Sequence, residues 1–400
     1  MIDAKRILER AQSREGWVAD LLAELVSVRS PSCGEREVIE LACERMREVG
    51  FDEVRVDGLG SAVGQIGSGK RVVAIDAHVD TVGAGEPSLW SMDPFDGRVE
   101  GGKVWGRGAA DQKGGLASMI LAGRIVKELG LAGDVTLLCT ATVMEEDCDG
   151  LCWRHLIEEE GIRPDVCVIT EPTGLAVYRG QRGRMEMEVG VKGVSAHGSA
   201  PERGDNAIYR MSRIVAEIEA LGPELGDDDF LGRGTAVVSD ISSTAPSLCS
   251  VPDSCRIHID RRLTAGEGRE LAVSQIEKIA AGHGGRVVVP EYREASYTGK
   301  VFPMEKYYPS WIVPEDAPAV TAARAAFKGL FNTEARVGRW TFSTNGVAIC
   351  GLHGIPCVGF GPGFEQQAHA PDEWTPAAHL WKAAAFYAMY PFVLAKGSTI

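Results

Sequence analysis

The chain lacks the features of a membrane or secreted protein. No apolar run in its 400 residues reaches the roughly 20 residues that a bilayer-crossing helix needs. Residues 1–26 read as an amphipathic helical pattern with interspersed charges, without the apolar core and cleavage site of a secretory signal. We therefore expect a cytoplasmic protein.

Basic residues are in deficit. Lys and Arg total 42 against 56 Asp and Glu, which gives a formal net charge of −14. Nucleic acids and anionic membranes attract a basic face, so this charge argues against both as partners. An acidic chain is instead compatible with a site that concentrates divalent cations.

Two common binding motifs are also missing. The ten cysteines are scattered, without the paired spacing of a zinc finger, and we interpret them as reduced, mostly buried thiols. The glycine-rich stretch around Lys113 is not a nucleotide-binding loop, because Lys113 is followed by Gly rather than Ser or Thr.

What the chain does contain is an alternation of strand and helix patterns. Residues 71–80 (RVVAIDAHVD) read as a strand buried on both faces, and further buried strands are expected at 134–142 and 165–170. A helix is predicted over 114–130, and residues 1–50 are predicted to form two helices joined by a loop. This alternation predicts an α/β fold with a mostly parallel sheet and helices on both faces.

The pattern changes near residue 184. Strands alternating apolar and charged residues, interleaved with helices in the order β-α-β-β-α-β, indicate an α+β (ferredoxin-like) domain with an antiparallel sheet. We place it at residues 184–293. Residues 1–183 and 294–400 then form one domain, into which this second domain is inserted.

His78 and Asp80 end the central strand. Strand alternation puts both on one side, and the carboxyl end of a parallel strand is where open α/β sheets place their chemistry. His78 could bind a metal through one ring nitrogen while Asp80 holds the ring in orientation. Alone, the pair could equally be a surface histidine at a strand end.

Other polar residues follow strands or glycine-rich turns further along the chain. They are Asp111, Glu145, Glu146, Glu171 and His369. Singly, each has a structural explanation, such as a helix cap or a solvated helix end. Together with His78 they form a nitrogen and oxygen ligand set that suits zinc, cobalt or manganese.

The charges of this set balance two divalent ions. Asp111, Glu146, Glu171 and a bridging hydroxide supply four negative charges, which leaves Glu145 free to take a proton from water. Two metals about 3.5–4 Å apart can share that water and polarise a carbonyl. The chemistry is hydrolysis of an amide-like bond with Glu145 as general base.

Five motifs carrying these residues occur in one order. They are HVD (78–80), GRGAADQKGG (106–115), MEED (144–147), TEPT (170–173) and AHAPDE (368–373). In this order, with an inserted domain, the chain resembles the dinuclear-zinc peptidase/deacylase family. That family includes acetylornithine deacetylase, succinyl-diaminopimelate desuccinylase, aminoacylase-1 and bacterial glutamate carboxypeptidases. The resemblance covers essentially the whole chain. It implies that residues 1–183 and 294–400 form a catalytic metallohydrolase domain and that residues 184–293 form an inserted lid or dimerisation domain.

The resemblance implies a role for each residue of the set. His78 and Glu171 look like ligands of one metal, Glu146 and His369 of the other, and Asp111 bridges both. Asp80 would orient His78. Glu145 would be the general base.

The resemblance also extends to the inserted domain and a late loop. His197 resembles the family histidine that reaches the partner subunit's site and hydrogen-bonds the developing oxyanion, which implies a homodimer. Arg262 matches the arginine that grips a substrate carboxylate, with Arg261 as its rival. Asn345 lies in the loop resembling the family's substrate-side segment. Cys249 stands near a place where the family often has Asn.

The segments 179–189, 195–211 and 341–349 look closest to a hydrolase subgroup linked to selenium-dependent metabolism. We expect a hydrolase that cleaves the C–N amide bond of a small N-acyl or carbamoyl amino-acid-like substrate. Its cofactors would be two divalent ions, zinc foremost, with cobalt or manganese as alternatives. A dipeptidase or carboxypeptidase on the same site, or an inactive binding protein on the same fold, are the other hypotheses.

Overall fold

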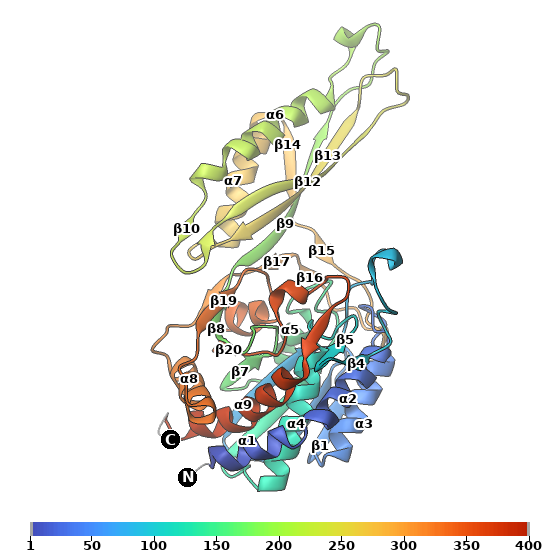
Figure 1. Ribbon diagram of the computed structural model, residues 1–400. Coiled ribbons are helices and arrows are strands. Elements are labelled where there is room, and N and C mark those ends of the chain that lie inside the picture. Colours follow the sequence, from blue (N-terminus) through green and yellow to red (C-terminus); the bar gives the residue numbers. More distant parts are fainter. Residues whose placement is uncertain (1–2, 398–400) are drawn as a thin grey trace.

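The computed structural model describes residues 3–397, which fold into a larger and a smaller unit (Figure 1). The larger unit is built on a nine-stranded sheet and the smaller one on a five-stranded sheet. Each unit has its own cluster of buried hydrophobic residues. The smaller unit projects from the larger one and is connected to it through β9 and the β15–β17 region (Figure 1).

The large sheet has the strand order β1-β2-β6-β3-β7-β20-β8-β18, with β19 also paired to β8. Its strands are β1 (Glu53–Val56), β2 (Ala62–Ile66), β3 (Arg71–His78), β6 (Val135–Thr142), β7 (Val166–Ile169), β8 (Val177–Gln181), β18 (Trp311–Ile312), β19 (Val337–Trp340) and β20 (Cys357–Gly359).

The centre of this sheet is parallel. Strand β3 pairs in parallel with β6 and β7, and β20 pairs in parallel with β7. Residues Val73 to His78 of β3 are all buried, as expected for a strand covered on both faces. The mostly parallel α/β fold predicted from the sequence is confirmed, and the carboxyl ends of β3, β6 and β7 lie at one edge.

Helices cover the sheet. They are α1 (Ala4–Gln12), α2 (Glu15–Ser27), α3 (Arg36–Glu48), α4 (Lys113–Leu129), α5 (Leu151–Glu158), α8 (Pro318–Phe331) and α9 (Ala377–Ala395), with a π-helix at Val347–Leu352. Helix α4 begins close to β7. A Cβ on Gly115 would lie 2.0 Å from the Thr170 Oγ1 atom, so only glycine allows this approach.

The N-terminal prediction of two helices is wrong, because residues 4–48 form three. The predicted first helix is broken between α1 and α2. Ser13 ends α1, and its hydroxyl donates a hydrogen bond to the Arg10 carbonyl at 2.8 Å. Serine competes in this way for the backbone groups that would continue a helix.

The smaller unit follows the predicted β-α-β-β-α-β order. Its main elements are β9 (Gly183–Lys192), α6 (Ala207–Ala220), β12 (Thr235–Thr244), β13 (Ser254–Leu263), α7 (Arg269–Gly282) and β14 (Gly285–Val288). The strands are antiparallel in the order β12-β13-β9-β14. Buried residues alternate along β9 and β13, and their apolar side chains pack with those of α6 and α7.

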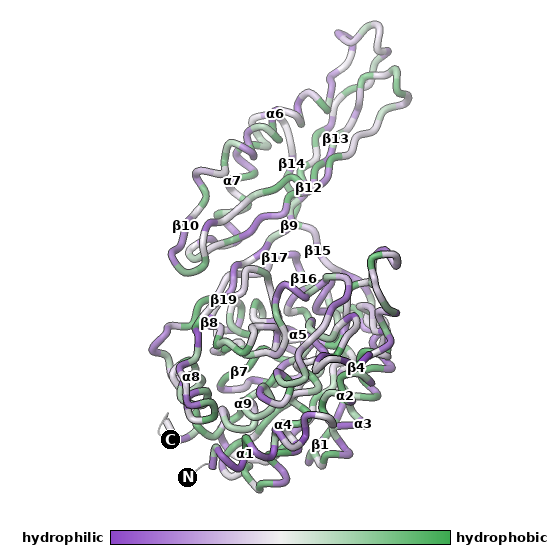
Figure 2. The backbone as a smooth tube through the Cα atoms, viewed as in Figure 1, coloured by the Kyte–Doolittle hydropathy of each residue, from purple (hydrophilic) through white to green (hydrophobic). Residues whose placement is uncertain are grey.

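Strand β8 runs almost directly into β9, and Figure 2 shows hydrophilic residues at this junction. Short elements complete the fold: β4 (Arg98–Glu100), β5 (Lys103–Trp105), β10 (Asp227–Asp228), β11 (Gly232–Arg233), β15 (Glu291–Tyr292), β16 (Met304–Glu305), β17 (Tyr307–Tyr308), β21 (Trp374–Pro376) and 3-10 turns at Pro87–Leu89, Pro201–Arg203, Gly222–Glu224 and Glu365–Gln367. Among the helices of residues 3–397, none is long and apolar enough to cross a membrane.

Candidate metal centre

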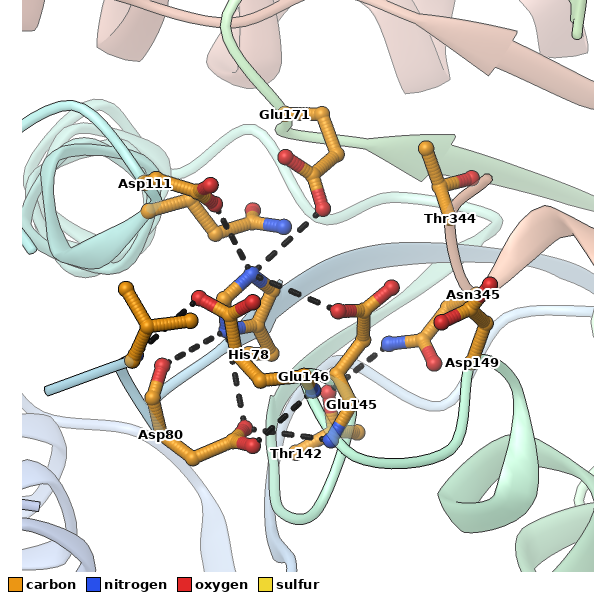
Figure 3. Close-up of polar contacts among 12 residues, drawn as sticks. His78, Asp80, Asp111, Thr142, Glu145, Glu146, Asp149, Glu171, Thr344 and Asn345 are labelled. Atoms are coloured by element: carbon orange, nitrogen blue, oxygen red, sulfur yellow. Dashed lines mark hydrogen bonds and ion pairs between the residues drawn. The ribbon is translucent and has the colours of Figure 1, made fainter. Parts of the chain in front are cut away.

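His78 lies at the end of β3 and is 1% exposed (Figure 3). Its Nδ1 lies 2.9 Å from the backbone carbonyl oxygen of Asp80. Its Nε2 lies 3.0 Å from Asp111 Oδ1, 3.5 Å from Glu171 Oε1 and 3.8 Å from Glu145 Oε2. With Nδ1 occupied by a carbonyl acceptor, Nε2 is the nitrogen that can face a metal.

Asp80 contacts both the His78 ring and the backbone of the turn that carries Glu145 and Glu146. Its carboxylate lies 3.5 Å from His78 Nδ1, farther than its own carbonyl oxygen. The same carboxylate accepts hydrogen bonds from the backbone N–H groups of Glu145 and Glu146, at 3.1 and 3.0 Å. Ser32 adds a third, from its hydroxyl at 2.7 Å. Asp80 therefore holds the turn that presents both glutamates.

Asp111 is held by a buried glutamate for which the sequence suggested no role. Glu373 accepts hydrogen bonds from the backbone N–H groups of Gly108, Ala110 and Asp111, at 3.1, 2.7 and 3.0 Å. It also pairs with Arg107, whose Nη1 lies 2.6 Å from Glu373 Oε2. The loop that carries Asp111 is thus fixed by a residue 262 positions away in the sequence.

A second histidine approaches Asp111 from the other side. His369 Nε2 lies 3.0 Å from Glu146 Oε2 and 3.3 Å from Asp111 Oδ2. Its backbone has a positive φ of 60°, which residues other than glycine rarely adopt. Asp111 therefore has one oxygen toward His78 and the other toward His369, as a bridging ligand requires.

The buried carboxylates of this cluster favour the binding of cations. Burial, reinforced by the charge of Asp111, raises the pKa of Glu171 to about 8, and burial raises the pKa of Glu145 well above its usual range. Within residues 3–397, Glu145 Oε1 and Glu171 Oε2 are buried without a hydrogen-bond partner. Buried carboxylates are costly unless paired or bound to a metal.

The donor set fits divalent ions. His78, Glu145 and Glu171 offer ligand atoms within 4.8 Å of one another, and so do His78, Asp111 and Glu146. One imidazole nitrogen with several carboxylate oxygens suits zinc, cobalt or manganese. The predicted metal ligands and Glu145 therefore come together at one place, although they span residues 78 to 369.

A cavity of about 370 Å³ opens over this cluster. Its lining includes Arg262 from β13, the residue predicted to bind substrate. The Arg262 guanidinium is held by two hydrogen bonds to the Asp260 carboxylate, at 2.7 and 2.9 Å. The rival, Arg261, is fully buried and paired with Glu267 inside the smaller unit.

Asn345 does not line the cavity in this structure. It is 1% exposed, and its Nδ2 donates to Asp76 Oδ2 at 2.8 Å. Its Oδ1 accepts from the Gly150 backbone N–H at 3.0 Å. These contacts join β3 to the loop after Glu146, which is a supporting position rather than a substrate contact.

His197 lies in the smaller unit, outside the cavity of its own chain. Its side chain is exposed, in a turn bridged to Ser250. The backbone N–H of Ser199 donates to His197 Nδ1 at 3.1 Å, so the neutral ring carries its proton on Nε2. Nε2 is therefore a hydrogen-bond donor available to another molecule.

The cavity also contains polar residues that sequence reasoning missed. Asp149, Arg184 and Glu365 line it beside the ligand cluster. Asp149 follows the two glutamates closely in the chain, and this was the one available signal. Arg184 and Glu365 carry none, because only the packing of the two units and the late loop brings them to the cavity.

Comparisons of the sequence point to one family. The sequence model of peptidase family M20/M25/M40 matches residues 74–391. YgeY of Escherichia coli (strain K12), an uncharacterized protein, is 51% identical over 392 residues, covering 98% of this chain and 97% of that protein. Succinyl-diaminopimelate desuccinylase of Cereibacter sphaeroides (strain ATCC 17029 / ATH 2.4.9) is 28% identical over 273 residues, covering 65% and 71%.

Solved structures share the fold. An M20 family metallo-carboxypeptidase, Sso-CP2 from Sulfolobus solfataricus, aligns with a TM-score of 0.74 at 18% identity, covering 94% of this chain and 99% of that one. Human carnosine dipeptidase 1 aligns with a TM-score of 0.70 at 16% identity, covering 98% and 100%.

Proposed function

The chain belongs to peptidase family M20/M25/M40 and is a metal-dependent hydrolase, and we propose that it cleaves the C–N amide bond of a small N-acyl or N-carbamoyl amino acid. The observation that carries the proposal is the buried cluster in which Asp111, Glu171 and Glu145 surround His78. The three carboxylates of this cluster line one cavity. Hydrolysis of a dipeptide on the same site is the alternative, and it differs only in the acyl half of the substrate.

The cluster supports a two-metal assignment. His78 and Glu171 would hold one ion, Glu146 and His369 the other, and Asp111 both. The position of Asp111 between the two histidines supports this division. When bound, two divalent ions lower the pKa of water and polarise a carbonyl. Zinc, cobalt and manganese all suit the donors.

Glu145 is the proposed general base. In the described chain, the Glu145 Oε1 atom is buried without a hydrogen-bond partner. Glu145 lies next to the proposed metal ligands but is not itself assigned as a ligand of either ion. It takes the proton from the attacking water and returns it to the leaving amine. Asp80 fixes the Glu145 backbone, so the carboxylate is held in place before substrate arrives.

Substrate contacts come from the smaller unit. Arg262 would bind the carboxylate of the amino-acid half, since a guanidinium offers two parallel N–H donors. His197 would donate from Nε2 to the developing oxyanion in the site of a second copy. The exposed strand β12, which pairs only with β13 in the described residues, supports a homodimer formed through the smaller unit.

A Glu145→Gln variant tests the mechanism. We expect kcat to fall by about 10²–10⁴-fold, with metal content unchanged in elemental analysis. A Glu224→Gln variant on the surface of the smaller unit is the control. Full activity of Glu145→Gln with metals bound would show that Glu145 is not the base. N-acyl amino acids, N-carbamoyl amino acids and dipeptides, compared by kcat/KM, decide between deacylase and dipeptidase.

Mixing two inactive variants tests the role of His197. If His197 acts on the partner's site, a His197→Ala chain and a Glu145→Gln chain together form one complete site. We expect activity to recover after subunit exchange. If His197→Ala is inactive and mixing restores nothing, His197 does not act across the dimer.

A further inference from the structure

Asp149 and Arg184 form a polar pair in the cavity that the proposed hydrolysis does not use. Arg184 Nη2 donates to Asp149 Oδ1 at 3.3 Å, and both residues line the cavity. Asp149 lies on the side of Glu145 away from His78 (Figure 3). The pair therefore stands next to the reacting centre, yet outside the group of proposed metal ligands.

The hydrogen bonding of this pair is incomplete. Asp149 is 6% exposed, and within residues 3–397 its Oδ2 has no hydrogen-bond partner; the same is true of Arg184 Nε. Arg184 is held in place by the Tyr308 ring, whose centre lies 4.7 Å from its guanidinium carbon. A buried carboxylate oxygen without a donor is unfavourable. At the wall of a cavity, a ligand can supply that donor.

The location of the pair indicates which half of the substrate it meets. Arg184 on β9 is the register partner of Arg262 on β13, and both side chains line the cavity. Directly opposed residues of antiparallel strands project from the same face. Because Arg262 is proposed to bind the carboxylate of the amino-acid half, Arg184 and Asp149 lie beside that half.

We propose that Asp149 and Arg184 select a substrate whose amino-acid side chain ends in a neutral planar amide, either a carboxamide or a ureido group. This inference rests on the proposed function. Such a group donates an N–H to Asp149 and accepts from Arg184 through its carbonyl oxygen. An ammonium group would face the Arg184 cation, and a carboxylate would face Asp149. An alkyl side chain would offer no hydrogen-bond partner to either Asp149 or Arg184.

The first test compares matched substrates with the full-length, metal-loaded protein. They are N-acetyl-glutamine, N-acetyl-citrulline, N-acetyl-glutamate, N-acetyl-ornithine and N-acetyl-norleucine. We expect the kcat/KM of the glutamine and citrulline derivatives to exceed the others by about tenfold or more. A preference for the glutamate, ornithine or norleucine derivative would overturn the proposal.

Variants then assign the preference to the pair. Asp149→Asn removes the shorter of the two carboxylate contacts of Arg184, at 3.3 Å, and leaves only Glu186 at 3.8 Å. The preferred substrate should therefore shift to N-acetyl-glutamate. The double variant Asp149→Leu/Arg184→Met removes both charges together and avoids an unpaired buried charge. It should lower the preference for the glutamine over the norleucine derivative by about 10- to 100-fold. An unchanged ranking in both variants would refute the assignment.

Arg256→Gln is the matched control, because Arg256 on β13 pairs with the Glu188 carboxylate at 2.8 Å, as Arg184 pairs with Asp149, but outside the cavity. Its substrate ranking should equal that of the wild type. If the wild type hydrolyses none of these compounds and no dipeptide, the proposed function fails by itself. Calorimetric binding then decides the inference: tighter binding of N-acetyl-glutamine than of N-acetyl-glutamate supports it, and the reverse or equality overturns it.

Discussion

Replacement of Glu373 by Ala should destabilise the protein strongly, although Glu373 is not a proposed metal ligand. The side chain is fully buried and joins the Asp111 loop to the segment after His369. Its removal leaves Arg107, 3% exposed, without its carboxylate partner. It also removes the acceptor of the backbone N–H groups of Ala110 and Asp111.

The magnitude follows from burial. Each buried N–H left without an acceptor costs about 1–3 kcal/mol, and breaking a buried ion pair costs about 3–5 kcal/mol. Because these contacts belong to one network, their costs do not add. We expect the free energy of unfolding to fall by about 3–5 kcal/mol. The affinity for metal should also fall, because the Asp111 loop is no longer fixed in place.

A surface pair provides the matched control. Arg45 and Glu24 are 2.6 Å apart, as are Arg107 and Glu373, but their side chains are 21% and 40% exposed. Glu24→Ala should cost about 0–1 kcal/mol. Urea unfolding at pH 8 compares the two, above the pKa of about 7 to which burial raises Glu373. Equal losses in both variants, with metal content retained, would refute the reasoning.

Two further predictions concern the metal centre and its backbone. In the metal-free protein, burial raises the pKa of Glu171 to about 8, and hydrogen bonds to Asp111 and Glu146 raise that of His369 to about 10, so both hold protons at pH 7. Metal ligands must be deprotonated, so binding should release protons and tighten as the pH rises from about 6 to 8; calorimetry whose heat is independent of the buffer would contradict this. Gly361→Ala should lower the free energy of unfolding by about 1–3 kcal/mol, because its Cβ would lie 2.1 Å from the Glu171 carbonyl oxygen. Gly190→Ala, with nothing within 4 Å, should change it by less than about 0.5 kcal/mol in the same urea titration.

Local patterns were sufficient for most secondary structure. The buried run of β3 and the alternating strand β9 were predicted because burial on two faces or on one leaves a direct mark on the residue order. The break between α1 and α2 was missed. A single Ser13 interrupts a pattern that otherwise continues, and one hydroxyl bond to the backbone has no periodic signature.

The supporting residues of the site could not be predicted. Glu373 binds the Asp111 loop and Asn345 binds Asp76, across 262 and 269 positions of sequence. By residue type and local sequence, Glu373 would be expected to be a solvent-exposed acid and Asn345 an ordinary loop residue. Their burial depends on neighbours supplied by other elements, so no property of their own segments distinguishes them.

The sequence alone determined the residue types of the site, their order along the chain, and the strand ends and loops on which they lie. These depend on local periodicity and on the chemistry of each side chain. The tertiary structure decided which of these groups meet: Asp111 between His78 and His369, Arg184 beside Asp149, and Asn345 away from the cavity. Such pairings depend on how sheet, helices and the smaller unit pack, and packing is a property of the whole chain rather than of any segment.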